Sequence, residues 1–219
     1  MKVDLRGLYA DKTFTELETA ALQWLDGFYQ LEHLLSARAW TIRLCGGAAS
    51  SELKFAALVH DAERFFPGGP SSTPGNGFDD PDYLFAHSIR SADIVESWMR
   101  ERQPVLDDGF IRRVRALILR HEIGGGWEAD LLQAADSLSF IETLDWLTVD
   151  WVRKGVYTKE EARQKLRWMV ERIRPPLAMQ WAIPIHEHAV HLLEHAYELD
   201  VDLVERRRAA GDRALMLGH

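Results

Sequence analysis

Apolar side chains recur every three to four residues along most of this chain, which is the spacing of one face of an α-helix. No stretch of convincing length alternates apolar and polar residues as a half-buried strand would. The pattern therefore predicts an all-α fold. The expected helical segments are 16–29, 31–44, 52–60, 82–100, 109–121, 128–151, 159–172 and 184–215, the last with an interruption near Asp200.

Glycine and proline mark the expected boundaries between these segments. They occur at Gly46-Gly47, in the loop 67–81, at 124–126 and at Pro175-Pro176. A chain of 219 residues suits one domain with a buried core. We expect a single-domain helical bundle over residues 1–175, with a C-terminal helical extension, 176–219, packed on the same domain.

Composition excludes several classes of protein. The 26 Lys and Arg residues against 34 Asp and Glu give a net charge of −8, which argues against binding a nucleic-acid duplex. The only cysteine, Cys45, leaves no disulfide framework and no thiolate zinc site. Without a secretory signal or a long apolar run, we expect a cytoplasmic protein with no membrane partner. A homodimer through an apolar helix face stays open.

Four histidines lie on four different predicted helices or helix ends, and two aspartates lie at or beside apolar helical runs. Burying a lone carboxylate costs several kcal/mol unless it is paired or bound to a metal. Imidazole and carboxylate together suit a first-row transition metal. Any one of these histidines alone is read as an ordinary core or surface residue, but the ordered set favours metal binding. The set is His33, His60, Asp61, His87, His121 and Asp136.

This ordered set resembles the H…HD…H…H…D pattern of the HD-domain metal-dependent phosphohydrolase superfamily. The resemblance covers about residues 14 to 150. Within it, the segment 53–61 is similar to the family's AALLHD sequence, and 134–138 is similar to its closing DADxL helix. The resemblance implies an HD-type helical bundle.

The resemblance also implies the ligand set. His33, His60, Asp61 and Asp136 would hold one metal ion, and His87 with His121 would hold a second, with Asp61 bridging the two. The cofactor expected is a divalent transition metal, two ions of Mn, Fe, Co, Ni or Zn. Two ions that share a hydroxide activate it for attack on phosphorus. The expected activity is hydrolysis of a nucleotide or another small phosphorylated metabolite.

The residues after the His-Asp pair differ from the family pattern, which is commonly HDxGK or HDxGH. Arg64 stands where the family has lysine and is expected to bind the substrate phosphate. Glu63 falls two residues after Asp61, whereas the one-metal nucleotidase branch has a glutamate three residues after its aspartate. This difference argues against membership of that branch. We therefore name Asp61, Arg64 and Glu122 as catalytic, and Arg64 and Arg90 as substrate-binding, with Glu122 orienting a ligand or acting as acid or base.

Two other functions remain open on the same residues. One is a mixed-valent di-iron oxygenase of the same superfamily, and the other is a metal-containing sensor or scaffold without turnover. A second group of histidines is expected to form a polar helix face, because three of them recur at i, i+3 and i+7 without other anchored ligands. Its members are His186, His188, His191 and His195.

Overall fold

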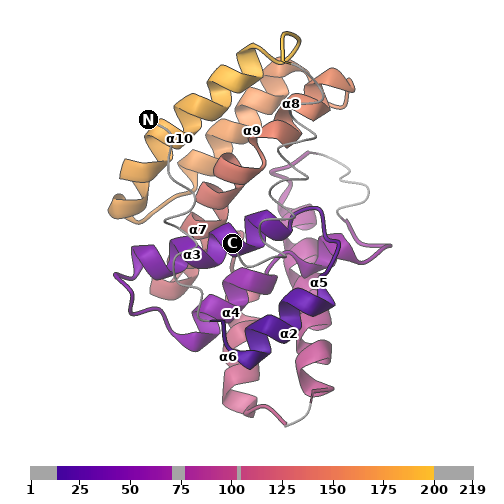
Figure 1. Ribbon diagram of the computed structural model, residues 1–219, viewed down its shortest axis with the longest axis vertical. Helices are drawn as coiled ribbons and strands as arrows, with labels where there is room; N and C mark the ends of the chain where they lie inside the picture. Colours follow the sequence, from indigo (N-terminus) through magenta and orange to yellow (C-terminus); the bar gives the residue numbers. More distant parts are fainter. Residues whose placement is uncertain (1–13, 71–76, 103–104, 200–219) are drawn as a thin grey trace.

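The computed structural model describes residues 14–70, 77–102 and 105–199 (Figure 1). This part of the chain is built from helices and contains no strand, so the predicted single-domain all-α fold is confirmed. The elements are α2 (Glu16–Trp24), α3 (Leu31–Leu44), α4 (Ser51–Val59), the short 3₁₀ helix η1 (Ala62–Phe65), α5 (Pro81–Arg100), α6 (Asp108–Ile118), α7 (Trp127–Thr143), α8 (Asp145–Arg153), α9 (Lys159–Glu171) and α10 (Pro176–Glu194).

Helix α7 lies at the centre of the arrangement. It contacts α3, α4 and α6 on one side and α8, α9 and α10 on the other. Figure 1 shows the second group above the first. One cluster of buried apolar side chains extends from Ala21 to Ala196 and joins the two groups. Polar residues on the inner face of α7 therefore lie deep in the molecule.

Side-chain caps explain where most helices begin. Thr15 and Thr158 each form a capping box with the glutamate three residues later, and Ser50 accepts a hydrogen bond from the third residue of α4. Asp80 and Asp107 cap α5 and α6 in the same way. These are positions where the sequence pattern also places helix starts, within one or two residues.

Several expected helices end earlier than the apolar pattern predicts; the helix expected over 109–121 ends at Ile118, and two others differ more. The first helix ends at Trp24 instead of Tyr29, because the chain turns at Gly27, whose φ is +83°. The segment 128–151 is two helices that meet at Leu144. There the Asp145 carboxylate accepts a hydrogen bond from the backbone N–H of Trp146, which competes with a continuous helix.

The last helix begins eight residues before the expected start at Pro184. Pro176 occupies its first turn, where the missing N–H is not needed, and Pro184 lies inside the helix. Helix α10 packs against α7, α8 and α9 and ends at Glu194. The part of the predicted helix beyond residue 199, and residues 71–76 of the predicted loop, lie outside the described residues.

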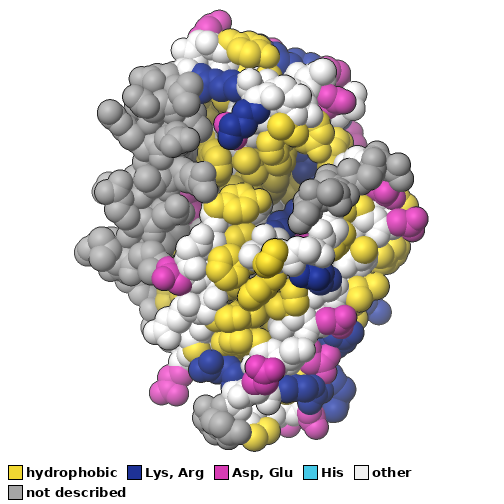
Figure 2. All heavy atoms as spheres, turned by 90° about the vertical axis from the view of Figure 1, so that its right-hand side faces the viewer, with side chains coloured by type: hydrophobic (Ala, Val, Ile, Leu, Met, Phe, Trp, Pro, Cys, Tyr) yellow, Lys and Arg dark blue, Asp and Glu magenta, His cyan; other side chains and the backbone are white. Residues whose placement is uncertain are grey.

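The histidines of the interior are not visible on the face of the molecule shown in Figure 2. Figure 2 shows hydrophobic side chains over much of one face, with a few basic side chains set back between them and no histidine. Within the described residues, no helix combines the length and the apolar character needed to cross a lipid bilayer.

Candidate metal centre

The structure brings the six predicted ligand residues together in the interior. They come from five separate segments, and each residue is at most 5% exposed. The segments are α3 for His33, the end of α4 for His60 and Asp61, α5 for His87, the turn after α6 for His121, and α7 for Asp136.

Two groups of potential ligands share Asp61. His33, His60 and Asp61 form the first, and Asp61, His87 and His121 form the second; within each group the ligand atoms lie within 4.8 Å of one another. Asp136 adjoins the first group, because its Oδ1 lies 3.3 Å from Nε2 of both His33 and His60. The arrangement could hold metal ions on both sides of one carboxylate.

Backbone carbonyl groups orient two of the imidazole rings. The Nδ1 of His60 donates to the carbonyl oxygen of Ala57 at 2.9 Å, and the Nδ1 of His121 donates to that of Ile118 at 2.7 Å. A proton on Nδ1 leaves the Nε2 lone pair free, and in both residues Nε2 faces the carboxylates of the site.

Side chains orient the other two rings to the same effect. The Ser139 hydroxyl donates to the backbone oxygen of Asp136 at 3.0 Å and therefore accepts from the Nδ1 of His33 at 2.9 Å. The Glu63 carboxylate accepts from the Nδ1 of His87 at 2.7 Å. Such outer partners are a common feature of metal-binding histidines, because they select the ring nitrogen that faces the metal.

The surroundings of the Nε2 atom of His121 indicate whether these residues fit a metal ion. His121 is fully buried, and this atom has no hydrogen-bond partner among the described residues. The nearest carboxylate oxygens, on Glu122 and Asp61, lie 3.6 and 3.7 Å away. An unpartnered imidazole nitrogen beside carboxylates is a donor set that fits a divalent transition metal.

The carboxylates attract positive charge to the centre. Burial opposes a charge on His60, but Asp61 and Asp136 outweigh it and raise the pKa of this imidazole to about 9. Burial would likewise raise the pKa of the Asp61 carboxyl, yet Arg64 and the adjacent histidines hold it well below its usual range. Both aspartates are therefore ionised and available as ligands.

Two arginines lie against these carboxylates. Arg64 donates from Nε to Asp61 at 2.8 Å and from a terminal nitrogen to the Tyr83 hydroxyl at 3.0 Å. Arg172, on the turn after α9, bonds to both Asp136 and Glu122, and its side chain is 7% exposed.

The predicted substrate-binding and catalytic residues differ in whether they line a cavity. Arg64 and Glu122 line a cavity above the ligand groups, whereas Arg90 does not line it and donates to the Pro67 carbonyl at 2.8 Å. Burial would raise the pKa of Glu122, but Arg172 outweighs it and keeps the carboxyl ionised far below its usual range. This favours a role for Glu122 as an anionic partner over one as a proton donor.

The cavity has a volume of about 290 Å³ and is lined by residues of α5, α7, α8 and α9. Asp61, Glu122 and Asp136 lie at its charged end. Lys165 of α9 also lines it, and burial lowers the pKa of the lysine amine to about 7, with the positive charge of Arg172 acting in the same direction. The sequence pattern gives no reason to select Arg172, Lys165 or Ser139, because none belongs to a recognisable motif.

A glycine turn connects His121 to α7. Gly124 and Gly125 have φ of +66° and +96°, a conformation that costs other residues about 1–2 kcal/mol. A β-carbon at Gly125 would meet open space, but one at Gly124 would collide with the side chains of Arg174 and Asp130.

We expect Gly124→Ala to lower the free energy of unfolding by more than Gly125→Ala, which serves as the matched control with backbone strain alone. The atoms of Arg174 and Asp130 that the new β-carbon would meet are the far ends of flexible side chains that can move aside, so the expected difference is at most about 1 kcal/mol, the loss of the Arg174–Asp130 ion pair. Urea unfolding of both variants measures it. Equal losses would contradict the packing of this turn.

The C-terminal histidines form no comparable centre. The rings of His191 and His195 lie with centroids 4.4 Å apart on α10, and both His188 and His191 are exposed. Among the described residues, the two groups around Asp61 are the sets of three or more potential ligands, and none includes a residue of α10.

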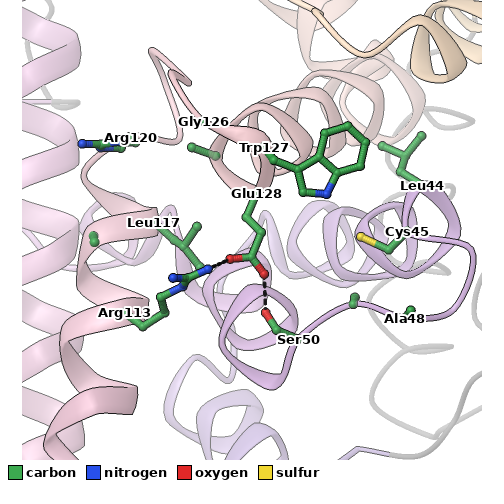
Figure 3. Close-up of a pocket in the computed structure, with 13 residues that line it drawn as sticks. Leu44, Cys45, Ala48, Ser50, Arg113, Leu117, Arg120, Gly126, Trp127 and Glu128 are labelled. Atoms are coloured by element: carbon green, nitrogen blue, oxygen red, sulfur yellow. Dashed lines mark hydrogen bonds and ion pairs between the residues drawn. The ribbon is translucent and has the colours of Figure 1, made fainter.

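A second pocket, of about 630 Å³, lies where α3, α6 and α7 meet (Figure 3). Three of its polar side chains are paired with one another. Glu128 accepts a hydrogen bond from Ser50 at 2.7 Å and forms an ion pair with Arg113. Trp127 and Cys45 lie together on the other side. None of its lining residues is a histidine or an aspartate.

Fold and site together define an all-α protein with a buried cluster of histidine and aspartate residues that could bind metal. No family model matches the chain, and neither do the curated proteins or the solved structures with which it was compared.

Proposed function

We propose that this protein is a metal-dependent phosphohydrolase of the HD-domain type that acts on a small phosphorylated compound. The observation that carries the proposal is the sharing of Asp61 by two groups of potential ligands, at the end of a cavity lined by basic side chains. Ligand groups of this kind suit two first-row divalent ions, and the basic side chains suit an anionic substrate.

Two divalent ions bound there would supply a hydroxide at neutral pH and would offset negative charge on a phosphoryl group. The protein contributes the positions of the groups around them. Ser139 and Glu63 orient His33 and His87, and the backbone orients the other two rings. The six ligand residues are then nearly inaccessible to bulk water, which strengthens their electrostatic interactions.

Arg64 is the residue best placed to bind the phosphoryl oxygens. It lines the cavity, and its bonds to Asp61 and Tyr83 set the position of the guanidinium group beside the shared ligand. Preorganised positive charge of this kind stabilises the charge that develops on a phosphoryl group during transfer. Arg90 does not line this cavity and stays a prediction as a substrate contact.

The experiment is elemental analysis of the full chain, purified without a histidine tag and supplied with Mn²⁺ or Fe²⁺, then dialysed. We expect about two ions per chain, and about one after His87→Ala, because His87 belongs to only one ligand group. The matched control is His188→Ala, which removes an exposed histidine from α10.

The same preparations are then tested under anaerobic conditions for phosphate release from a panel of phosphate esters, and in air for oxygen consumption. Release that stops when a chelator is added would support hydrolysis. Metal binding combined with oxygen consumption and no phosphate release would contradict it and would favour an oxygenase. One ion per chain, unchanged by His87→Ala, would overturn the two-ion arrangement.

A further inference from the structure

Lys165 differs from the other basic side chains of the cavity in what it contacts. Arg64 and Arg172 are each held by carboxylates of the site. Within the described residues, the amine of Lys165 has no ion pair with a carboxylate and no hydrogen bond. Among the described residues it is thus the basic group of the cavity lining that forms no ion pair with a carboxylate.

Aromatic rings surround this amine instead. The Nζ of Lys165 lies 4.3 Å from the ring centroid of Trp168, 5.1 Å from that of Phe140 and 5.2 Å from that of Phe78. Aromatic faces attract a cation, but they are poor acceptors for its N–H groups. The donors of Lys165 are therefore available to an acceptor in the cavity.

The rest of the cavity lining is largely aromatic and aliphatic. Rings contribute to it from both groups of helices, and Leu84, Leu147, Val156 and Met169 fill the spaces between them. The volume of about 290 Å³ is at the small end of the range for ligand sites, which excludes polymers and long lipids. The rings are those of Tyr29, Phe78, Tyr83, Phe140, Trp151 and Tyr157.

We infer that the site takes a small phosphate monoester whose alcohol part carries an aromatic ring, and that Lys165 binds its phosphoryl oxygens. The inference rests on the proposed function for the nature of the anion. The ring occupies the apolar wall, where it stacks on the protein's own rings, and the phosphoryl group lies at the charged end beside Arg64. Lys165 acts here as a substrate-binding residue that sets specificity.

The test is calorimetric binding of two non-hydrolysable phosphonates to the full chain loaded with Mn²⁺. One is 3-phenylpropylphosphonate, which matches 2-phenylethyl phosphate; the other is 3,4-dihydroxybutylphosphonate, which matches glycerol 3-phosphate. We expect the phenyl compound to bind at least about tenfold more tightly, from burial of its ring. Lys165→Met is expected to weaken both about 10- to 100-fold, from loss of a charged hydrogen bond.

Two further variants separate the parts of the inference. Trp151→Leu removes a ring from the apolar wall and is expected to reduce the preference for the phenyl compound while the dihydroxybutyl compound binds as before. Lys154→Met removes an exposed lysine paired with Asp150 on α8 and is expected to change neither affinity.

Equal affinities for the two phosphonates, or Lys165→Met binding within about twofold of the native chain, would overturn the inference. Phosphate release from 2-phenylethyl phosphate and glycerol 3-phosphate is measured in parallel. Release without a ring preference would overturn the inference and support the proposed function. The expected binding pattern, combined with no phosphate release from either ester, would contradict the proposed hydrolase activity and would still support the inferred binding of the aromatic phosphate ester.

Discussion

Asp61→Asn is expected to reduce bound metal from about two ions per chain to fewer than one and to lower phosphate release more than about a hundredfold. Loss of an outer partner that merely orients a ligand typically costs 10- to 100-fold, so loss of the shared ligand should cost more. The Oδ1 of Asp61 lies 2.8 Å from Nε2 of His87, and its Oδ2 lies 3.9 Å from Nε2 of His33. Asparagine keeps the shape of the side chain and removes the negative charge that faces both groups.

The measurement combines elemental analysis with the rate of phosphate release at saturating substrate. Asp93→Asn is the matched control, because it makes the same chemical change at a carboxylate that is exposed on α5 and paired with Arg115. Circular dichroism establishes that both variants are folded. An Asp61→Asn protein that retains two ions would refute the bridging role, and one that retains full turnover would refute the catalytic role.

Arg172→Met is expected to lower the free energy of unfolding of the metal-free protein by about 3–5 kcal/mol, the cost of leaving a buried charge without its partner. Arg172 bonds to Asp136 and Glu122, and all three side chains are at most 8% exposed. Burial favours the neutral form of both carboxyls, and Arg172 is the main group that opposes this effect. Methionine fills similar space and supplies no charge.

Urea unfolding with a chelator, and again with Mn²⁺, measures this effect. We expect added metal to recover part of the loss, because a cation bound at Asp136 replaces part of the missing positive charge and stabilises the folded state by mass action. Arg167→Met, at an exposed position of α9, is the control. A loss no larger than that of the control would contradict the buried ion-pair network.

Much of the ligand arrangement could be predicted from the sequence. His60-Asp61 follows directly after an apolar helix, and the other four predicted ligands lie on amphipathic helices or, for His121, just beyond the end of one, so the apolar residues beside them carry each into the interior. The order of these residues adds what single residues lack. Their convergence on Asp61 in the structure agrees with the predicted ligand set.

Other residues of the site could not be predicted in this way. Lys165 lies on α9 and Arg172 directly follows it; this segment is rich in charged residues and lies about thirty residues beyond Asp136. Their position at the cavity follows from the packing of α9 against α7. In the sequence they are indistinguishable from the solvated basic residues around them, because charge alone does not record burial.

The helix boundaries could likewise be predicted only in part from the sequence. Apolar spacing continues through Leu144, and the sequence therefore predicts one helix over 128–151. At the junction, the backbone N–H of Trp146 donates to the Asp145 side chain, a bond that competes locally with the helix. Helix α8 also packs against α9 and α10, and apolar spacing does not contain these contacts.

By itself, the sequence determined the all-α class, most helix starts and six histidine and aspartate residues that converge in the interior, because apolar periodicity and capping residues are local properties of the chain. Only the tertiary structure decided which nitrogen of each histidine faces the centre and which arginines pair with its carboxylates. It also places Lys165 at the cavity, where it forms no ion pair with a carboxylate of the described residues. Those features depend on distances between segments far apart in the chain, and such distances are set only when the helices pack.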